Sequence, residues 1–226
     1  MFRLVTLAFC ALFLAHSSLW ASGIQQTPSP SVFSILHDGE KIGRHTVTYR
    51  RDGEDLHVDI AIDIEIRVFF IPVFKYNHRN SEIWRGERLI SMTTKTNDDG
   101  TEYWVKAHAT AEGLAVETTD ESFIAPADTM PTSYWSKNTV VRSTLLDTQF
   151  GRLVEVALSP ETVQHIETTA GTIEAQRFDM LGDLTLSLWY TPSGRWVKTA
   201  FSVRGTEIEY LLQEQPMRTV EQIRPQ

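Results

Sequence analysis

Residues 56–70 read LHVDIAIDIEIRVFF, and a large apolar side chain occupies every second position from Leu56 to Phe70. Most of the positions between them are polar or charged. This alternation predicts one long β-strand with an apolar face and a polar face. A strand over this range spans on the order of 50 Å, far beyond the usual length, and therefore indicates a large, curved antiparallel sheet.

Tight turns are predicted where an Asp-Gly pair separates two alternating segments, because glycine accepts a positive φ easily and aspartate tolerates it. The pairs are Asp38-Gly39, Asp52-Gly53 and Asp99-Gly100. Further strands are expected over residues 88–96, 102–109, 114–119, 152–158, 162–168, 172–180, 184–190, 195–203 and 206–212. The fold class predicted is all-β, mainly antiparallel, with one large, strongly curved sheet or open β-barrel of about ten strands and little helix.

Three places depart from this simple pattern. Pro72 lacks a backbone N–H, so we expect it to end or bend the long strand. A short helical turn is the best helical candidate after Pro131, with Thr132 or Ser133 as its cap. Residues 139–146 fit either a helix or a strand, and the strand is preferred because of their apolar residues.

The two ends of the chain differ from the middle. Residues 1–23 predict a cleaved signal peptide, because Arg3 precedes a short apolar run and Ala21-Ser22-Gly23 supplies small residues; an uncleaved membrane anchor is the alternative. Residues 24–31 predict a flexible linker, 32–212 a single β-rich domain and 213–226 a flexible tail. We therefore expect a periplasmic or secreted protein with no stable transmembrane span after processing.

Composition excludes several classes of function. The formal net charge is −8, which disfavours nucleic acid as a partner, and the single cysteine, Cys10, lies in the predicted signal peptide. The sequence contains no Gly-x-Ser-x-Gly, His-Glu-x-x-His or glycine-rich phosphate loop. His57 with Asp59 is explained by a solvated strand face, and residues 97–100 by a turn. No catalytic residue, metal site or cofactor is therefore predicted.

Aromatic groups supply the candidate ligand-binding residues. Trp189 and Trp196 flank the turn at residues 191–194, which is expected to bring the two indoles near one another. With Tyr134, Trp135 and Arg195 they are candidates for a pocket mouth that binds a carboxylate or phosphate, and cross-strand aromatic packing is the alternative.

A second apolar group surrounds Pro72. Residues 69–74 lose the alternation of the long strand, so they are apolar on both faces. Such a segment is either covered by a neighbouring loop or offered to a partner or acyl chain, and Phe70 and Phe74 are the candidate contact residues.

Several short motifs occur in a characteristic order. They are residues 38–43 (DGEKIG), 82–86 (EIWRG), 96–100 (TNDDG), 132–135 (TSYW), 188–190 (LWY) with 194–196 (GRW), and 204–210 (RGTEIEY). Together they resemble an uncharacterised family of exported β-rich proteins from Gram-negative bacteria, known as a domain of unknown function. The strand pattern is also loosely similar to the open barrels that carry lipoproteins or lipids across the periplasm. The resemblance implies no reaction.

The function expected from these features is non-enzymatic binding or carriage of a lipid-like or amphipathic ligand, with a lipid-like small molecule or an envelope protein as partner. Two alternatives remain. One is a hydrolase acting on cell-envelope polymers, and the other is an envelope assembly or interaction protein that pairs through a sheet edge.

Overall fold

A computed structural model describes residues 27–168, 171–203 and 205–213. The predicted signal peptide (1–23) and the predicted tail beyond residue 213 lie outside these residues. Residues 27–30 of the predicted linker are exposed and precede the first strand. Among the described residues, no helix is long and apolar enough to cross a membrane.

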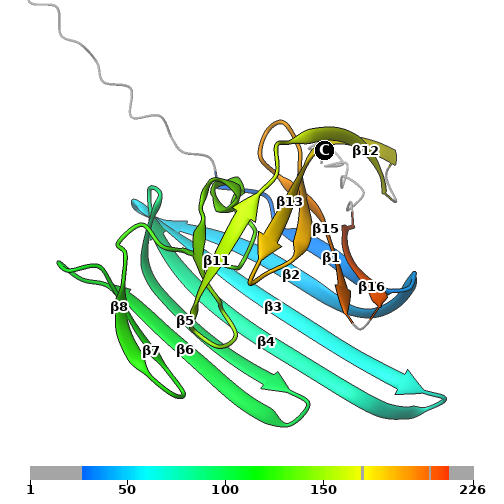
Figure 1. Ribbon diagram of the computed structural model, residues 1–226, viewed down its shortest axis with the longest axis horizontal. Coiled ribbons are helices and arrows are strands. Elements are labelled where there is room, and N and C mark those ends of the chain that lie inside the picture. Colours follow the sequence, from blue (N-terminus) through cyan, green and yellow to red (C-terminus); the bar gives the residue numbers. More distant parts are fainter. Residues whose placement is uncertain (1–26, 169–170, 204, 214–226) are drawn as a thin grey trace, which may run out of the picture.

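The described chain is almost entirely strand (Figure 1). Its strands are β1 (Ser31–His37), β2 (Glu40–Asp52), β3 (Asp55–Val68), β4 (Ile71–Arg85), β5 (Arg88–Asp98), β6 (Thr101–Ala109), β7 (Leu114–Thr118), β8 (Ser122–Ala125), β9 (Met130–Pro131), β10 (Thr144–Leu146), β11 (Leu153–Leu158), β12 (Thr162–Thr168), β13 (Gly171–Gly182), β14 (Leu186–Tyr190), β15 (Trp196–Val203) and β16 (Thr206–Leu212). One 3-10 turn, η1 (Lys137–Val141), is present.

The strands form one sixteen-stranded sheet in the order β8-β7-β6-β5-β4-β3-β2-β1-β16-β15-β14-β13-β11-β10-β9, with β12 paired to β13 beside this path. Every pairing is antiparallel except that of β9 with β10. Because β8 and β9 stand at opposite ends of the order, the sheet does not close into a complete barrel. The predicted fold class is confirmed, although the strand count exceeds the ten expected.

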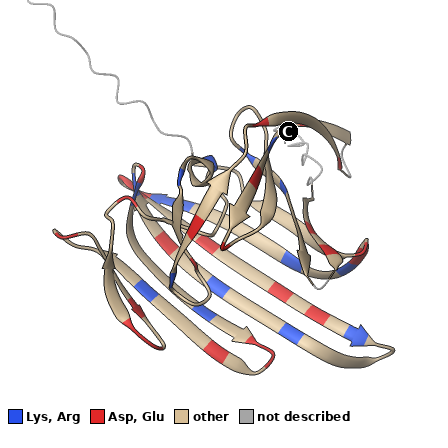
Figure 2. Ribbon diagram, viewed as in Figure 1, with Lys and Arg blue, Asp and Glu red and all other residues tan. Residues whose placement is uncertain are grey.

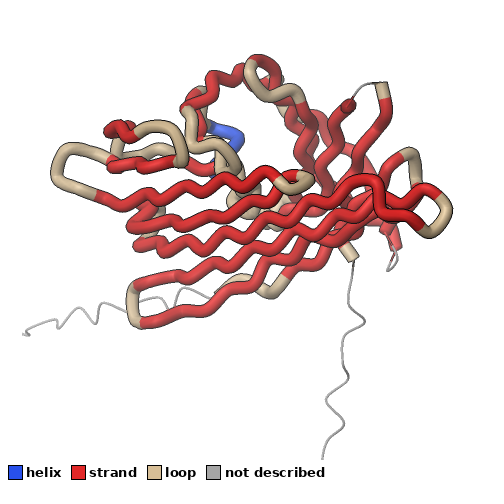
Figure 3. Tube along the Cα trace, turned by 90° about the horizontal axis from the view of Figure 1, so that it is seen from below, coloured by secondary structure: helices blue, strands red, loops and turns tan. Residues whose placement is uncertain are grey.

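The sheet coils back on itself, so its later strands cover its earlier ones. In Figure 1, β11 and β13 lie over the broad layer made by β2 to β6, and Figure 3 shows the curled strand trace from a second direction. The core fills the space between the two layers. Buried residues come from the layer, such as Val58 and Met92, and from the covering half, such as Leu145, Leu188 and Tyr190.

The long strand predicted from Leu56 to Phe70 is present but ends slightly earlier. β3 stops at Val68, and Phe69 and Phe70 form the turn into β4. Pro72 therefore follows the turn instead of bending β3, and it pairs with Arg67 where the register shifts. Such an irregularity is where a strand tolerates a residue without an N–H. β4 is a strand that the sequence pattern did not predict.

The connection between β8 and β11 corrects two further expectations. Residues 139–146 are not one strand: η1 occupies their first part and β10 only Thr144–Leu146. The cap of η1 is Ser136, whose side chain accepts a hydrogen bond from the backbone N of Asn138 at 3.3 Å. Thr132 and Ser133 precede this turn and lie in the wall described next.

Candidate functional site

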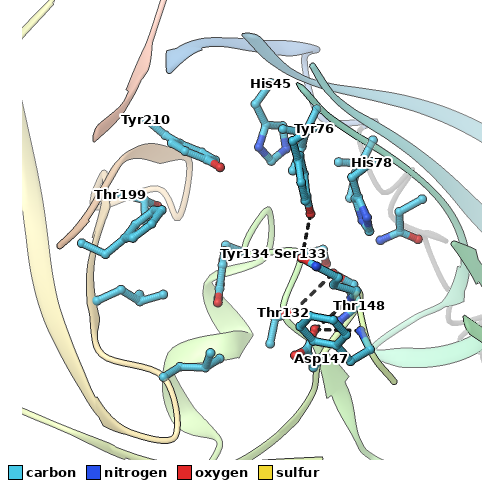
Figure 4. A pocket seen from close by; sticks show the side chains of 18 of the residues that line it. His45, Tyr76, His78, Thr132, Ser133, Tyr134, Asp147, Thr148, Thr199 and Tyr210 are labelled. Atoms are coloured by element: carbon cyan, nitrogen blue, oxygen red, sulfur yellow. Dashed lines mark hydrogen bonds between the residues drawn. The ribbon is translucent and has the colours of Figure 1, made fainter. Parts of the chain in front are cut away.

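A cavity of about 350 Å³ lies between the β2–β6 layer and the strands and loops that cover it (Figure 4). The layer contributes a wall of both polar and apolar side chains, namely His45, Ile60, Ile62, Tyr76, His78 and Asn80. The cover contributes residues of the 132–152 connection and of the later strands, among them Thr132, Ser133, Tyr134, Asp147, Thr148, Leu186, Thr199 and Tyr210.

Strand register brings the polar wall together. His45 of β2 lies opposite Ile62 of β3, which lies opposite His78 of β4. In the next inward row, Ile60 lies opposite Asn80. Because alternate residues of a strand share a face, the inward side of β4 presents polar groups where β3 presents isoleucines.

His45 is the most unusual residue of the cavity. Its side chain is only 3% exposed, and neither ring nitrogen has a hydrogen-bond partner. The rings of Phe33, Trp196 and Tyr210 surround it, with centroids 5.1 to 5.7 Å away. Burial, followed by the nearby His78, lowers the pKa of His45 to about 3. At neutral pH the ring is therefore uncharged and has one donor and one acceptor to offer.

His78 and Tyr76 continue this polar wall along β4. Nδ1 of His78 lies 2.8 Å from Oγ1 of Thr96 in a buried hydrogen bond. Burial lowers the pKa of His78 to about 4, with a smaller contribution from Arg79. The Tyr76 hydroxyl donates to Oε1 of Gln149 at 3.0 Å, which ties the sheet to the covering connection.

The next residues of β4 hold the cover in place. Glu82 is 1% exposed, and its Oε2 accepts hydrogen bonds from the indole N–H groups of Trp84 and Trp135, each at 2.8 Å. Asn80 donates through Nδ2 to Oε1 of Glu82 at 2.8 Å, but its own Oδ1 is buried without a partner. Burial raises the pKa of Glu82, although the surrounding donors oppose the shift. This network anchors the segment around Trp135 over the sheet.

Two tyrosines complete the wall on the covering side. In Figure 4, Tyr134 and Tyr210 lie on the side of the cavity that faces His45 and Tyr76. Burial raises the pKa of Tyr210 to about 12, so its hydroxyl stays protonated at neutral pH. Tyr134 adopts a positive φ of 58°, and its carbonyl accepts a hydrogen bond from the Tyr190 hydroxyl at 2.8 Å. The arrangement can hold a neutral molecule that has both polar and apolar parts.

Few residues that line the cavity carry a charge: Asp147 and Arg152 are the acidic and basic members of the lining. The Asp147 carboxylate accepts hydrogen bonds from the backbone N–H groups of Gln149 and Phe150, at 2.8 and 3.3 Å. Within the part of the chain that the structure describes, no group of three or more His, Cys, Asp or Glu side chains could hold a metal ion.

The candidate residues named from the sequence fall into four places. Tyr134 lines the cavity. Trp135, Arg195 and Trp196 line a second hollow of about 520 Å³, beside Tyr49 and Lys137.

Trp189 does not lie beside Trp196 on one face, so the expected closeness of the two indoles is wrong. A register shift in the β14–β15 pair leaves Trp189 opposite Lys198 and Tyr190 opposite Trp196. A bulge re-aims the side chains that follow it. Trp196 thus packs against Phe33 of the core, with ring centroids 4.1 Å apart. Trp189 instead donates a hydrogen bond from Nε1 to Oε1 of Gln164 in β12, at 2.9 Å.

Neither Phe70 nor Phe74 is among the residues that line the cavity: Phe70 lies in the β3–β4 turn, and Phe74 lies in β4 two residues before Tyr76. Phe70 is 89% exposed and Phe74 is half-buried.

The residues that matter most in the cavity, His45, His78 and Asn80, were not singled out from the sequence. In β4 both faces carry polar residues, so no apolar period marks the strand. The sequence did contain one indirect signal for β4: a strand as long as β3 requires a partner strand of similar length on each side.

Comparison with known proteins agrees with the fold. A family model described as "Domain of unknown function (DUF6134)" matches residues 33–213. A crystal structure from Brucella abortus, titled as a beta-barrel-like protein of domain of unknown function DUF1849, is similar with a TM-score of 0.57 and 10% sequence identity. The match covers 83% of this chain and 96% of that chain, and it shows a shared fold alone. No curated protein matches the chain.

Proposed function

The chain belongs to the family of the domain of unknown function DUF6134, and we propose that it is a non-enzymatic binding module for a small amphipathic, lipid-like molecule held in the cavity beside His45. In this proposal the protein is exported, works in the periplasm or outside the cell, and carries its ligand between the two layers of the sheet.

The observation that carries the proposal is the unpaired imidazole of His45. A buried polar group without a partner costs roughly 1–3 kcal/mol, so folded proteins rarely leave one unless something else supplies the hydrogen bond. His45 has two such atoms, and Oδ1 of Asn80 adds a third. All three belong to residues that line the same cavity. A ligand that supplies one acceptor and two donors would satisfy them.

The remaining lining supports an amphipathic ligand. Ile60, Ile62 and Leu186 supply apolar wall, while the tyrosines and histidines supply polar groups. A volume of about 350 Å³ is near the lower end of ordinary ligand sites, which run from about 300 to 1,000 Å³. The site therefore suits a small molecule or part of one chain better than a complete two-chain lipid.

The test compares ligand content and probe binding among three proteins. Wild type, Ile62→Trp and Val163→Trp are purified without detergent and analysed by native mass spectrometry, and each is then titrated with N-phenyl-1-naphthylamine, an apolar amine. Ile62 lines the cavity, whereas Val163 is a 61% exposed residue of β12 outside it and serves as the matched control.

We expect the wild type and Val163→Trp to bind the probe with the same affinity, and Ile62→Trp to bind it at least about tenfold more weakly because the indole fills the cavity. The proposal is wrong if no molecule is carried and the probe does not bind, or if Ile62→Trp binds as well as the wild type.

A further inference from the structure

The β3–β4 hairpin extends beyond the sheet that contains it. Pairing of β3 with β2 ends at Ile64, and pairing of β4 with β5 ends at Tyr76. Beyond these residues the two strands pair with each other, from Glu65 opposite Lys75 to Val68 opposite Ile71. Four residues of strand span roughly 13 Å. In Figure 1 the turn is the cyan hairpin that reaches farthest from the covering half of the molecule.

The apex of this hairpin is apolar and uncovered. Phe69 is 92% exposed and Phe70 89%, and Val68, Ile71 and Val73 are each more than half exposed. Because successive residues point to opposite faces, the unbroken apolar run from 68 to 71 makes both faces and the end of the ribbon apolar. We call residues 68–73 the apolar tip.

The turn itself is strained in a way that folding does not explain. Phe69 adopts a positive φ of 56°, a conformation that costs energy for a residue with a Cβ. The other tight turns of the chain use residues that tolerate it, such as Asp38 with Gly39 and Asp99 with Gly100. Since the Phe69 ring is almost fully exposed, the folded chain regains nothing from it. Such an outlier points to a role outside the fold.

Charged residues begin directly behind the tip. Arg67 and Lys75 both pair with Glu65, and both cations are more than half exposed. Figure 2 shows the apex without charge and the charged residues set back along β3 and β4. An apolar end followed by long cationic side chains matches the change from acyl chains to phosphate groups at a membrane surface.

We propose that the apolar tip inserts into the surface of a phospholipid bilayer and docks the protein there. A convex tip cannot enclose a small molecule, so its host must surround it, and a fluid lipid layer can contact every side of the ribbon. The formal net charge of −8 favours a zwitterionic surface over a strongly anionic one. This surface is separate from the cavity proposed above.

The first experiment measures flotation with phosphatidylcholine vesicles. Wild type is compared with the double variant Phe69→Ser, Phe70→Ser and with a control, Val141→Ser, Val163→Ser, which removes two exposed apolar residues elsewhere. We expect the wild type and the control to float with the vesicles. The tip variant should bind the vesicles at least about tenfold more weakly. All replaced side chains are largely exposed, so circular dichroism should show the same fold in each.

The second experiment locates the contact. Cys10 is the single cysteine of the chain, so Cys10→Ala with Phe70→Cys gives one thiol for an environment-sensitive nitrobenzoxadiazole label. Vesicles should shift the emission of this label to the blue and leave the same label on Val163→Cys unchanged.

Three results would overturn the proposal: wild type that does not float, a tip variant that floats equally well, or a label at position 70 that stays in water while the protein is bound. The cavity variant Ile62→Trp should float normally, so failure of one proposal is distinguishable from failure of the other.

Discussion

Acid should destabilise this protein through its two buried histidines. The pKa values of His45 and His78 fall from the ordinary 6.5 to about 3 and about 4 on folding. Between these values and pH 6.5, the unfolded chain binds protons that the folded chain does not. The stabilising contribution is therefore complete above pH 6.5 and is lost as the pH falls.

The size of the loss follows from the shift. At pH 5 each histidine is about 1.5 pH units below its unfolded pKa and still neutral in the folded chain, and each unit corresponds to about 1.4 kcal/mol. Each histidine thus contributes about 2 kcal/mol to the loss between pH 7.5 and pH 5, and the two together contribute about 4 kcal/mol. Glu82, whose pKa is raised by burial, opposes part of this, because its proton is held more tightly in the folded chain.

The assay is urea unfolding of wild type, His45→Leu and Leu188→Ala at both pH values. His45 has no hydrogen bond to lose and contacts aromatic rings, so leucine should remove about half of the histidine-dependent loss, or about 2 kcal/mol. Leu188 is fully buried and does not titrate, so its truncation should lower stability by about 2–5 kcal/mol equally at both pH values. If His45→Leu keeps the full pH dependence of the wild type, His45 is not a buried neutral residue and the reasoning fails.

Three further predictions concern the fold and the tip. Gly151→Ala should lower the free energy of unfolding by about 2–4 kcal/mol, because φ is +75° and the new Cβ would lie 2.3 Å from a methyl group of β7. The control Gly39→Ala, with φ +84° and open space around it, should lower the free energy of unfolding by only about 1 kcal/mol. Equal losses of the two variants in thermal denaturation would refute the clash. Trp135→Phe should lower the free energy of unfolding by about 1.5–3 kcal/mol, because it removes a hydrogen bond to a buried carboxylate. Trp104 is more exposed, so Trp104→Phe should change the free energy of unfolding in urea by less than about 0.5 kcal/mol. If Trp135→Phe leaves the stability unchanged, Trp135 does not anchor the cover. Phe69→Gly should raise the free energy of unfolding by up to about 1 kcal/mol by relieving a positive φ, yet weaken vesicle flotation; a loss of stability would show that the turn is unstrained.

The sequence predicted those parts of the fold in which each strand separates apolar from polar residues. β3 alternates almost without exception, and the three Asp-Gly pairs do lie between adjacent strands. The turn at Phe69 and Phe70 was missed because its residues are among the least suited to a tight turn.

Prediction failed where partners distant in sequence decide the outcome. Inward-facing His78, Asn80 and Glu82 make the middle of β4 look polar on both faces, and their burial depends on Thr96, Trp135 and the covering connection. The site was likewise hidden, because its defining feature is that the ring nitrogens of His45 have no partner, and a missing hydrogen bond leaves no trace in a sequence.

The pairing of the first strand with the last has a consequence for how the chain matures. β1 bonds to β16, so residues 31–37 must find residues 206–212 across nearly the whole domain. The β2–β8 meander needs only short-range contacts, whereas this join has among the largest sequence separations in the molecule. One edge of β1 therefore stays unpaired until residues 206–212 have been synthesised and can reach it. Such an edge is a site for mispairing with other chains, and a chaperone that shields it would raise the yield of correctly folded protein.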